Sequence, residues 1–428
     1  MRSASILALA LALEMCGCRG ILGIEQPIDP IDAGPENDAG DASVVTEDPS
    51  LCMTWQPHLF EPCALGEPSS ALQLAAGAYI YDTSVGGGTL SGPNGIVMQS
   101  SLTLAPSGGP ELAVLSVQAL AIDAGATLTV TGNKPLLLVS WSTVTVDGAI
   151  DASSHLGVID VDAHIARTVS FGAGANEACG DQAGKNGGDA ASTTGGPGAG
   201  GSGGGGGGAL QGGGGSASTG GAAAVIGGAG GSASIAAVLR GGCGGGLSGT
   251  AGDAALAPSV PSTRAEGGAG GGALRIAAFQ SISIAGSVSA NGAGGAGAPR
   301  RSSCGGGGGG SGGDLELEAQ VVTVSGSLSA NGGGGGGGGN TNEAGSDGAD
   351  GQVDVVAAPG GAVTSSGCGA AGGAGSAQRE LAGASASDAS TCGGGGGGGG
   401  AGFIFVAANA FTVEPSAKIS PPASIGSE

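Results

Sequence analysis

The sequence contains few aromatic and few basic side chains. Phe, Trp and Tyr make up 2% of its 428 residues, and 12 Lys and Arg stand against 34 Asp and Glu, for a formal net charge of −22. Proteins that bind nucleic acid neutralise its phosphates with clustered Lys and Arg. We therefore expect no nucleic-acid partner for this chain.

Complete catalytic motifs are also lacking. The many GxGxxG matches in glycine tracts carry no information without a strand and a helix around them. The segment at residues 180–185 lacks P-loop spacing and is followed by Asn186 instead of Ser or Thr. No GxSxG sequence with a strand before it and a helix after it is evident. We expect a protein that is not an enzyme and that needs no cofactor.

Glycine, in contrast, accounts for 100 of the 428 residues, and much of it lies in unbroken runs at 203–208, 305–310, 332–339 and 393–400. Glycine has no side chain to bury and loses much backbone freedom on ordering, so such a run cannot be held by its own hydrophobic burial. The runs are either flexible linkers or extended helices with three residues per turn that pack through backbone hydrogen bonds. Sparse charge favours the packed helices, because disordered segments are usually rich in charge and proline.

Cysteines punctuate the glycine-rich region, and each of these five directly precedes a glycine. They are Cys179, Cys243, Cys304, Cys368 and Cys392. A random linker has no reason for this placement, but the pairing cannot be read from spacing. Cys52 and Cys63 flank a compact stretch and are predicted to form a local disulfide, as is usual in exported proteins. A zinc site is the alternative, but one histidine between two cysteines falls short of four ligands.

The N-terminus has the layout of a bacterial export signal. One arginine precedes an apolar run at residues 6–13, which is too short to span a bilayer, and small residues follow. The sequence Met15-Cys16-Gly17-Cys18 resembles a lipobox, although Met15 stands where Leu is preferred. We predict a signal peptide at residues 1–17 and lipidation of Cys18; ordinary cleavage and free secretion is the alternative.

Residues 18–50 are predicted to form a tether. Prolines break secondary structure in this segment, and its many acidic side chains repel one another. Such a chain stays extended and solvated. It would hold the rest of the protein away from a membrane surface.

Short segments with period-two alternation of apolar residues recur after the tether and predict strands. Four of them begin near residues 117, 140, 279 and 319, a diverged one begins near 409, and most have a glycine at a tight turn. Ile122 and Val146 hold equivalent places 24 residues apart, the length of one coil of a parallel β-solenoid. Later segments stand farther apart because glycine-rich insertions leave repeatedly after the same turn.

The predicted fold class is therefore all-β. We expect an N-terminal segment at 51–109 with the local disulfide, and a parallel β-solenoid at 110–428 whose glycine-rich insertions pack as polyglycine II helices. The alternative is a β-sandwich with disordered glycine-rich loops.

Residues 305–339 join two glycine runs through an aliphatic strand and a Ser-Ala-Asn-Gly turn. In this they resemble glycine-rich, lipobox-bearing surface proteins of Gram-negative bacteria, and the composition is similar to that of polyglycine-rich cell-surface proteins and phage tail adhesins. The resemblance covers about residues 110–428. It implies surface display, and it transfers no catalytic residues. Arg19, in place of Asp, after Cys18 suits sorting to the outer membrane. From display at the surface and the low chemical diversity of the side chains we expect surface polysaccharide or other cells as partners.

Two clusters of polar residues are candidate metal or acid–base sites. Asp160, Asp162 and His164, with His155 nearby, would project from one face of a strand and could bind a metal or exchange protons. A solvated outer strand face explains the same alternation.

The second cluster is Asp347, Asp350 and Asp354. Carboxylates interspersed with glycine can hold Ca²⁺, but the tandem nonapeptide repeat of calcium-binding β-helices is missing. An exposed acidic turn is the simpler interpretation.

The sequence thus predicts a non-enzymatic surface lipoprotein with a structural or adhesive role. One alternative is a carbohydrate-active β-helix protein similar to polysaccharide lyases, which would need carboxylates beside a base, whereas Arg275 stands isolated in the sequence. The other is an ice-binding or matrix-binding scaffold, which would need a flat regular face, and no threonine ladder is evident.

Overall fold

A computed structural model describes the chain from residue 51 to residue 426 with internal gaps. The described ranges are 51–157, 169–190, 201–219, 225–233, 238–250, 264–299, 304–340, 343–363, 368–387 and 392–426. The predicted signal peptide, Cys18 and the tether lie outside them. Residues 49–428 belong to one compact unit.

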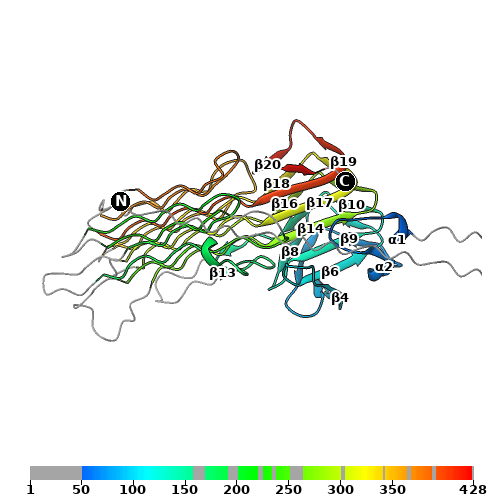
Figure 1. Cartoon of the computed structure of the whole chain (residues 1–428), viewed down its shortest axis with the longest axis horizontal. Coiled ribbons are helices and arrows are strands. Elements are labelled where there is room, and N and C mark those ends of the chain that lie inside the picture. The colour runs from blue at the N-terminus through cyan, green and yellow to red at the C-terminus, as the bar shows by residue number, and fades with distance from the viewer. Residues whose placement is uncertain are drawn as a thin grey trace, which may run out of the picture. The chain divides into compact units, whose positions relative to one another are not determined.

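The protein is nearly all-β, as predicted, and its strands form two large mixed sheets and a small one (Figure 1). Helical structure in the described ranges is limited to α1 (Leu51–Thr54), α2 (Pro62–Leu65) and a 3-10 turn at Gly180–Gln182. None of these helices has the length and apolar character needed to cross a bilayer.

The first sheet has 11 strands, and nine of them follow one another as neighbours. In this order they are β1 (Leu72–Leu74), β7 (Leu120–Ile122), β10 (Thr143–Val146), β15 (Ser281–Ile284), β17 (Asp314–Val324), β14 (Ala273–Ala278), β9 (Leu136–Ser140), β6 (Leu112–Val117) and β5 (Thr103–Leu104). The long strand β19 (Phe403–Val413) pairs with β17 and with β21 (Ser424–Gly426).

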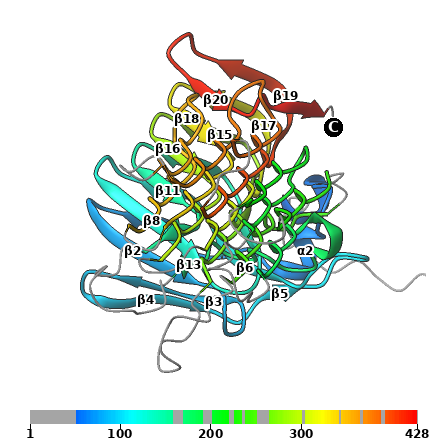
Figure 2. The same ribbon diagram turned by 90° about the vertical axis from the view of Figure 1, so that its left-hand side faces the viewer.

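The second sheet has eight strands. In spatial order they are β20 (Lys418–Ser420), β18 (Ser327–Ser329), β16 (Ser287–Ser289), β11 (Ala149–Asp151), β8 (Ala126–Thr131), β2 (Gly77–Asp82), β3 (Gly88–Gly92) and β4 (Gly95–Ser100). A separate pair joins β12 (His155–Leu156) to β13 (Val169–Ser170). Figure 2 shows β8, β11, β16 and β18 side by side along one flank of the molecule.

Parallel pairing aligns the apolar residues of strands that are far apart in the sequence. One aligned column consists of Ile122, Val146, Ile284, Val324 and Val413. Tight turns follow these strands. In the turn after β15, for example, the backbone N–H groups of Ala285 and Gly286 both donate to the carbonyl oxygen of Val146. Because side chains alternate between the faces of a strand, alignment in register places every such column on one face.

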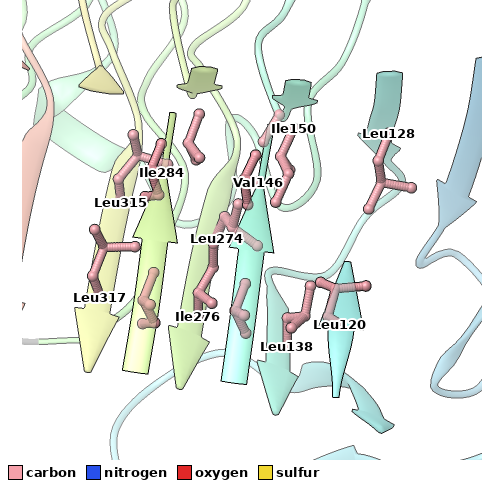
Figure 3. Close-up of a cluster of buried hydrophobic side chains, with 14 of the residues drawn as sticks. Leu120, Leu128, Leu138, Val146, Ile150, Leu274, Ile276, Ile284, Leu315 and Leu317 are labelled. Carbon is pink, nitrogen blue, oxygen red and sulfur yellow. The ribbon is translucent and has the colours of Figure 1, made fainter. Parts of the chain in front are cut away.

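The inward columns of both large sheets form one hydrophobic core. Leu138, Ile276 and Leu317 are aligned in the first sheet, and Leu128 and Ile150 in the second. All are at most 1% exposed, and Figure 3 shows them stacked in rows between the strands. Apolar burial stabilises by about 25 cal/mol per Å², so this stack supplies the hydrophobic stability that the glycine tracts cannot.

A second apolar cluster covers the outer face of the first sheet. It joins Trp55 and Phe60 of the N-terminal segment to Leu137, Val139 and other residues of β6, β9 and β14. Cys52 and Cys63, the pair predicted from their spacing, form a disulfide that closes this segment. The segment at 51–65 is thereby fixed on the sheet.

The glycine-rich segments run side by side away from the strands (Figure 1). Most of their glycines are buried, and their backbone groups bond to one another. In the tract at 203–208 every third amide nitrogen donates to the same neighbouring segment, at 2.7–3.0 Å. The donor–acceptor pairs are Gly203–Gly306 and Gly206–Gly309, then Gly204–Lys185 and Gly207–Gln182, then Gly205–Gly213 and Gly208–Leu210.

Three of the four predicted tracts close a ring of hydrogen bonds. Gly206 N donates to Gly309 O at 2.8 Å, Gly309 N to Gly397 O at 2.8 Å, and Gly397 N to Gly203 O at 3.0 Å. The fourth tract, 332–339, runs in the opposite direction, and its Gly336 N donates to Gly307 O at 2.8 Å. Each tract therefore bonds to neighbours on several sides, in contrast to a strand, which bonds only along its two edges.

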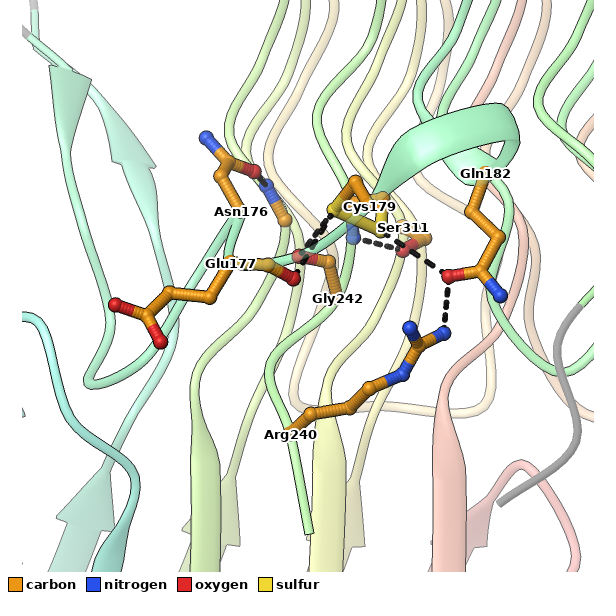
Figure 4. Close-up of a disulfide and its surroundings, with 9 residues drawn as sticks. Asn176, Glu177, Cys179, Gln182, Arg240, Gly242 and Ser311 are labelled. Atoms are coloured by element: carbon orange, nitrogen blue, oxygen red, sulfur yellow. Dashed lines mark hydrogen bonds between the residues drawn. A yellow bond between two sulfur atoms is a disulfide. The ribbon is translucent and has the colours of Figure 1, made fainter. Parts of the chain in front are cut away.

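Disulfides fasten two of the glycine-rich segments. Cys179 pairs with Cys243, and Cys368 pairs with Cys392. Figure 4 shows the first bond, beside which the backbone N–H of Cys243 donates to Ser311 Oγ at 2.8 Å. Cys304 is buried.

Replacing Gly308 by alanine is expected to destabilise the protein by about 1–3 kcal/mol, the usual effect of overpacking. An added Cβ would lie within 3.0 Å of the backbone of Gly204 and Gly205, where nothing flexible can move aside. The matched control is Gly214→Ala, because its Cβ would meet only Ser385 Oγ at 3.7 Å. Urea unfolding of both variants tests this, and equal stability of the two would contradict close backbone packing.

Candidate functional site

A cleft of about 300 Å³ lies between the N-terminal segment and the outer edge of the first sheet. Its walls include Thr54, Trp55 and Gln56 from the N-terminal segment and Phe279, Gln320 and Asn409 from the sheet. This cleft could not be predicted from the sequence, because its two walls are more than 200 residues apart in the chain.

Aromatic contacts build one wall of the cleft. Trp55 makes edge-to-face contacts with Phe60, Trp141 and Phe279, with ring centroids 5.4, 5.7 and 5.9 Å apart. Such pairs are each worth about 0.5–1.5 kcal/mol beyond their area. Four of the ten aromatic side chains in the sequence, Trp55, Phe60, Trp141 and Phe279, thus hold one short segment on the sheet.

Beneath the same segment lies a buried ionic cluster. Arg275 Nη1 donates to Glu316 Oε2 at 2.6 Å, and Nη2 donates to Glu318 Oε2. His58 approaches from the N-terminal segment: its backbone N–H donates to Glu318 Oε1 at 2.9 Å, and Nδ1 lies 2.8 Å from the same oxygen. Arg275, isolated in the sequence, is therefore the centre of a charged group that joins β14, β17 and residue 58.

Burial acts to raise the pKa of Glu318, but the charge and hydrogen bonds of Arg275 and the bonds from His58 outweigh it and lower the pKa overall. Glu318 is thus ionised and saturated with donors. A group in this state holds the segment in place and is poorly suited to take a proton from a substrate.

Asp314 is a further buried carboxyl, at the point where a glycine tract enters β17. Burial and the nearby charge of Glu316 raise its pKa to about 8, against the opposing effect of a hydrogen bond from Arg240 N at 3.3 Å. The carboxyl is therefore protonated at neutral pH. The residue is only 6% exposed.

His155 joins members of the two polar clusters that the sequence suggested separately. Its Nε2 lies 3.2 Å from Asp151 Oδ2 and its Nδ1 lies 3.2 Å from Asp350 Oδ2. Asp350 also accepts hydrogen bonds from the backbone of Leu156 at 3.1 Å and of Gly294 at 2.8 Å. The group thus ties β12 to the glycine-rich segments.

Both carboxylates raise the pKa of His155, to about 10, mainly through their hydrogen bonds. Burial acts to raise the pKa of Asp151, yet the hydrogen bonds from His155, Ser153 and Ser289 outweigh it and hold that pKa at about 2. This is an imidazolium between two carboxylates, and it is charged throughout the neutral range.

The other acidic residues of the second cluster lie apart from this group. Asp347 Oδ1 accepts a hydrogen bond from Gly297 N at 2.7 Å, and Asp354 Oδ2 lies 3.3 Å from Lys418 Nζ. In the described ranges no group of three His, Cys, Asp or Glu could hold a metal ion. Asp160, Asp162 and His164 lie outside those ranges.

A column of hydroxyl side chains follows one face of the first sheet. Parallel register aligns Thr145, Ser283, Thr323 and Thr412 on consecutive strands. Neighbouring strands are about 4.8 Å apart, so the hydroxyls repeat at that spacing. The column consists of three threonines and one serine, and it was not visible in the sequence because long insertions separate its members.

Comparison with known proteins gives no family for this chain. No family model, no curated protein and no solved structure matches it. Its function has to be inferred from its own residues.

The charge of His155 predicts a pH dependence of stability. Its pKa lies at about 10 in the folded protein against 6.5 ordinarily, so the stabilisation is complete below about pH 6.5 and is lost as the pH rises toward 10. His155 is 45% exposed, and solvent screening limits the loss to roughly 1 kcal/mol.

Urea unfolding of the wild type and of His155→Gln at pH 6 and pH 9.5 measures this. The wild type should be less stable at pH 9.5 than at pH 6, and this difference in unfolding free energy should be much smaller in the variant. NMR titration gives the pKa directly. An imidazole that titrates near 6.5, or an Asp350→Asn variant with an unchanged His155 pKa, would contradict the assignment.

Proposed function

We propose that this chain is an exported, lipid-anchored surface protein with a structural or adhesive role. In this proposal Cys18 carries the lipid, residues 18–50 span the distance from the outer membrane, and residues 51–428 form the displayed body. Its partners are surface polysaccharide or other cells.

The observation that carries the structural role is the hydrogen bonding between glycine tracts. Every third amide of a tract bonds to the same neighbour, the geometry expected of polyglycine II helices with three residues per turn. Such a body is held by backbone groups and needs no chemically diverse side chains. We accordingly assign the tracts to packed polyglycine II helices.

Parallel register supports the β-solenoid for the rest of the body. Strands β7, β10, β15 and β17 are neighbours in chain order, and glycine-rich segments leave after β11, β16 and β18. A β-sandwich would instead be built from antiparallel pairs.

Disulfides support export. Three of them close loops in the described ranges, and disulfides persist in oxidising compartments outside the cytosol. In a reducing cytosol the Cys179–Cys243 disulfide would be broken, and the glycine-rich segment that contains Cys243 would no longer be covalently linked to Cys179.

The competing carbohydrate-active enzyme would need carboxylates that converge on an accessible base. In the two charged clusters described above, Glu318 is instead bound by Arg275 and His58, and His155 by Asp151 and Asp350. This favours binding or structure over turnover.

Deletion of the gene is expected to reduce attachment of cells to surfaces or to one another, and re-expression to restore it. Protease added to intact cells should digest the protein, while Cys18→Ser should release it into the medium because the acylated thiol is absent. Unchanged attachment in the deletion strain would contradict the adhesive role. A chain protected from protease on intact cells would contradict surface display.

The hydroxyl column favours a second candidate function, a matrix-binding or ice-binding face. Replacing Thr323 by Arg puts a long charged side chain in the middle of the column and should abolish inhibition of ice recrystallisation, if the face has that role. Ser327→Arg, on the second sheet, is the control. No inhibition by the wild type would remove this candidate.

A further inference from the structure

We propose that the cleft between the N-terminal segment and the first sheet binds one uncharged sugar residue of a polysaccharide. This rests on the proposed surface role and names the chemistry that such a partner would meet.

The volume suits a small ligand. Pockets for small molecules usually measure about 300–1,000 Å³, and this cleft, at about 300 Å³, stands at the lower end. It is large enough for a single sugar ring but too small to enclose a longer oligosaccharide. The remainder of a chain would extend into solvent.

The lining combines an aromatic wall with uncharged polar groups. Trp55 and Phe279 lie on one side, with ring centroids 5.9 Å apart, and Gln56, Gln320 and Asn409 supply amides. Trp55 is itself buried, at 8% exposure, so the half-buried Phe279 ring is the aromatic surface against which the C–H groups of a sugar ring can pack. Each amide both donates and accepts hydrogen bonds, as a sugar hydroxyl does.

The three amide side chains are available for a ligand. Across the ranges that the structure describes, none of them has a hydrogen-bond partner in the protein, and all three residues are exposed. Gln320 and Asn409 lie at matching places on the paired strands β17 and β19, between the aligned pairs Ala319–Ala408 and Val321–Ala410. The two amide side chains thus branch from adjacent strands, which lie about 4.8 Å apart, and could reach neighbouring hydroxyls on one ring.

No unpaired charge lies in the cleft to attract an acidic or basic ligand. The ionisable side chain on its wall is that of His58, which is bound to Glu318 at 2.8 Å, and Glu318 is in turn paired with Arg275. A uronic acid would therefore find no cation free to bind its carboxylate. The chemistry selects a neutral sugar.

The wall formed by the N-terminal segment is held in place before any ligand arrives. The Cys52–Cys63 disulfide closes the segment, the Trp55 ring is packed against three aromatic rings, and two bonds from His58 tie it to Glu318. Preorganisation of this kind reduces the entropy lost on binding. It allows a small cleft to bind with useful affinity.

The test uses the purified protein without its lipid and a panel of glucose, galactose, mannose and N-acetylglucosamine, with galacturonate as the charged probe. Saturation-transfer NMR should show contact with at least one neutral sugar, and the fluorescence of the two tryptophans should change on binding. We expect Kd values in the millimolar range, as for single sugar residues on shallow sites.

Gln320→Ala and Asn409→Ala should each weaken binding about tenfold, since each removes a hydrogen bond to the sugar. Gln280→Ala is the matched control: Gln280 is an exposed amide just before β15, at the place that Gln320 holds before Val321, but it does not line the cleft. The affinity of the Gln280→Ala variant for the sugar should equal that of the wild type. The fluorescence of each unbound variant confirms that the Trp55 wall is intact.

Absence of binding by every neutral sugar would overturn the proposal, as would tighter binding of galacturonate. Equal weakening by Gln280→Ala and Gln320→Ala would place the sugar elsewhere and overturn it too. Protease digestion on intact cells tests surface display separately. Loss of sugar binding with display intact would thus remove the cleft assignment alone, and a hidden protein that still binds sugar would remove only the surface role.

Discussion

The hydrogen bond between two glycine backbones is the interaction on which this structure depends. Buried N–H and C=O groups must find partners, and glycine offers no side chain to supply them. The tracts satisfy this requirement by bonding to several neighbours in turn, and an added Cβ at most tract positions would collide with a neighbouring backbone. Glycine is therefore needed at these positions because of the close approach between chains.

The strands provide the frame from which the tracts extend. The first residues after β16 and β18 are Ala290 and Ala330, which accept hydrogen bonds from Gly313 at 2.8 Å and from Gly402 at 2.8 Å, where the tracts return. Pairing between strands thus continues as pairing between tracts. The hydrophobic core and the glycine lattice support one another through these shared ends, and the disulfides and His155 add cross-links near the same region.

Local patterns of the sequence were enough to predict the recurrent strands near residues 117, 140, 279, 319 and 409 and the Cys52–Cys63 bond, since each depends on residues close in the chain. The strands β1 to β5 of the N-terminal segment were not predicted. The contacts of the polar groups were not predictable in this way. Asp350 reaches His155 across 195 residues, and Glu318 meets His58 across 260. The cleft and the hydroxyl column could not be predicted for the same reason, because long glycine-rich insertions separate residues that strand register brings together.

Hydrogen exchange of the tract amides tests the central claim most directly. If backbone bonds between tracts hold the body together, then the amides of Gly206, Gly309, Gly336 and Gly397 should exchange many times more slowly than unstructured glycine, with protection comparable to that of β14 and β17. Exchange of these amides at the rate of an unstructured chain, while the strands stay protected, would contradict the account.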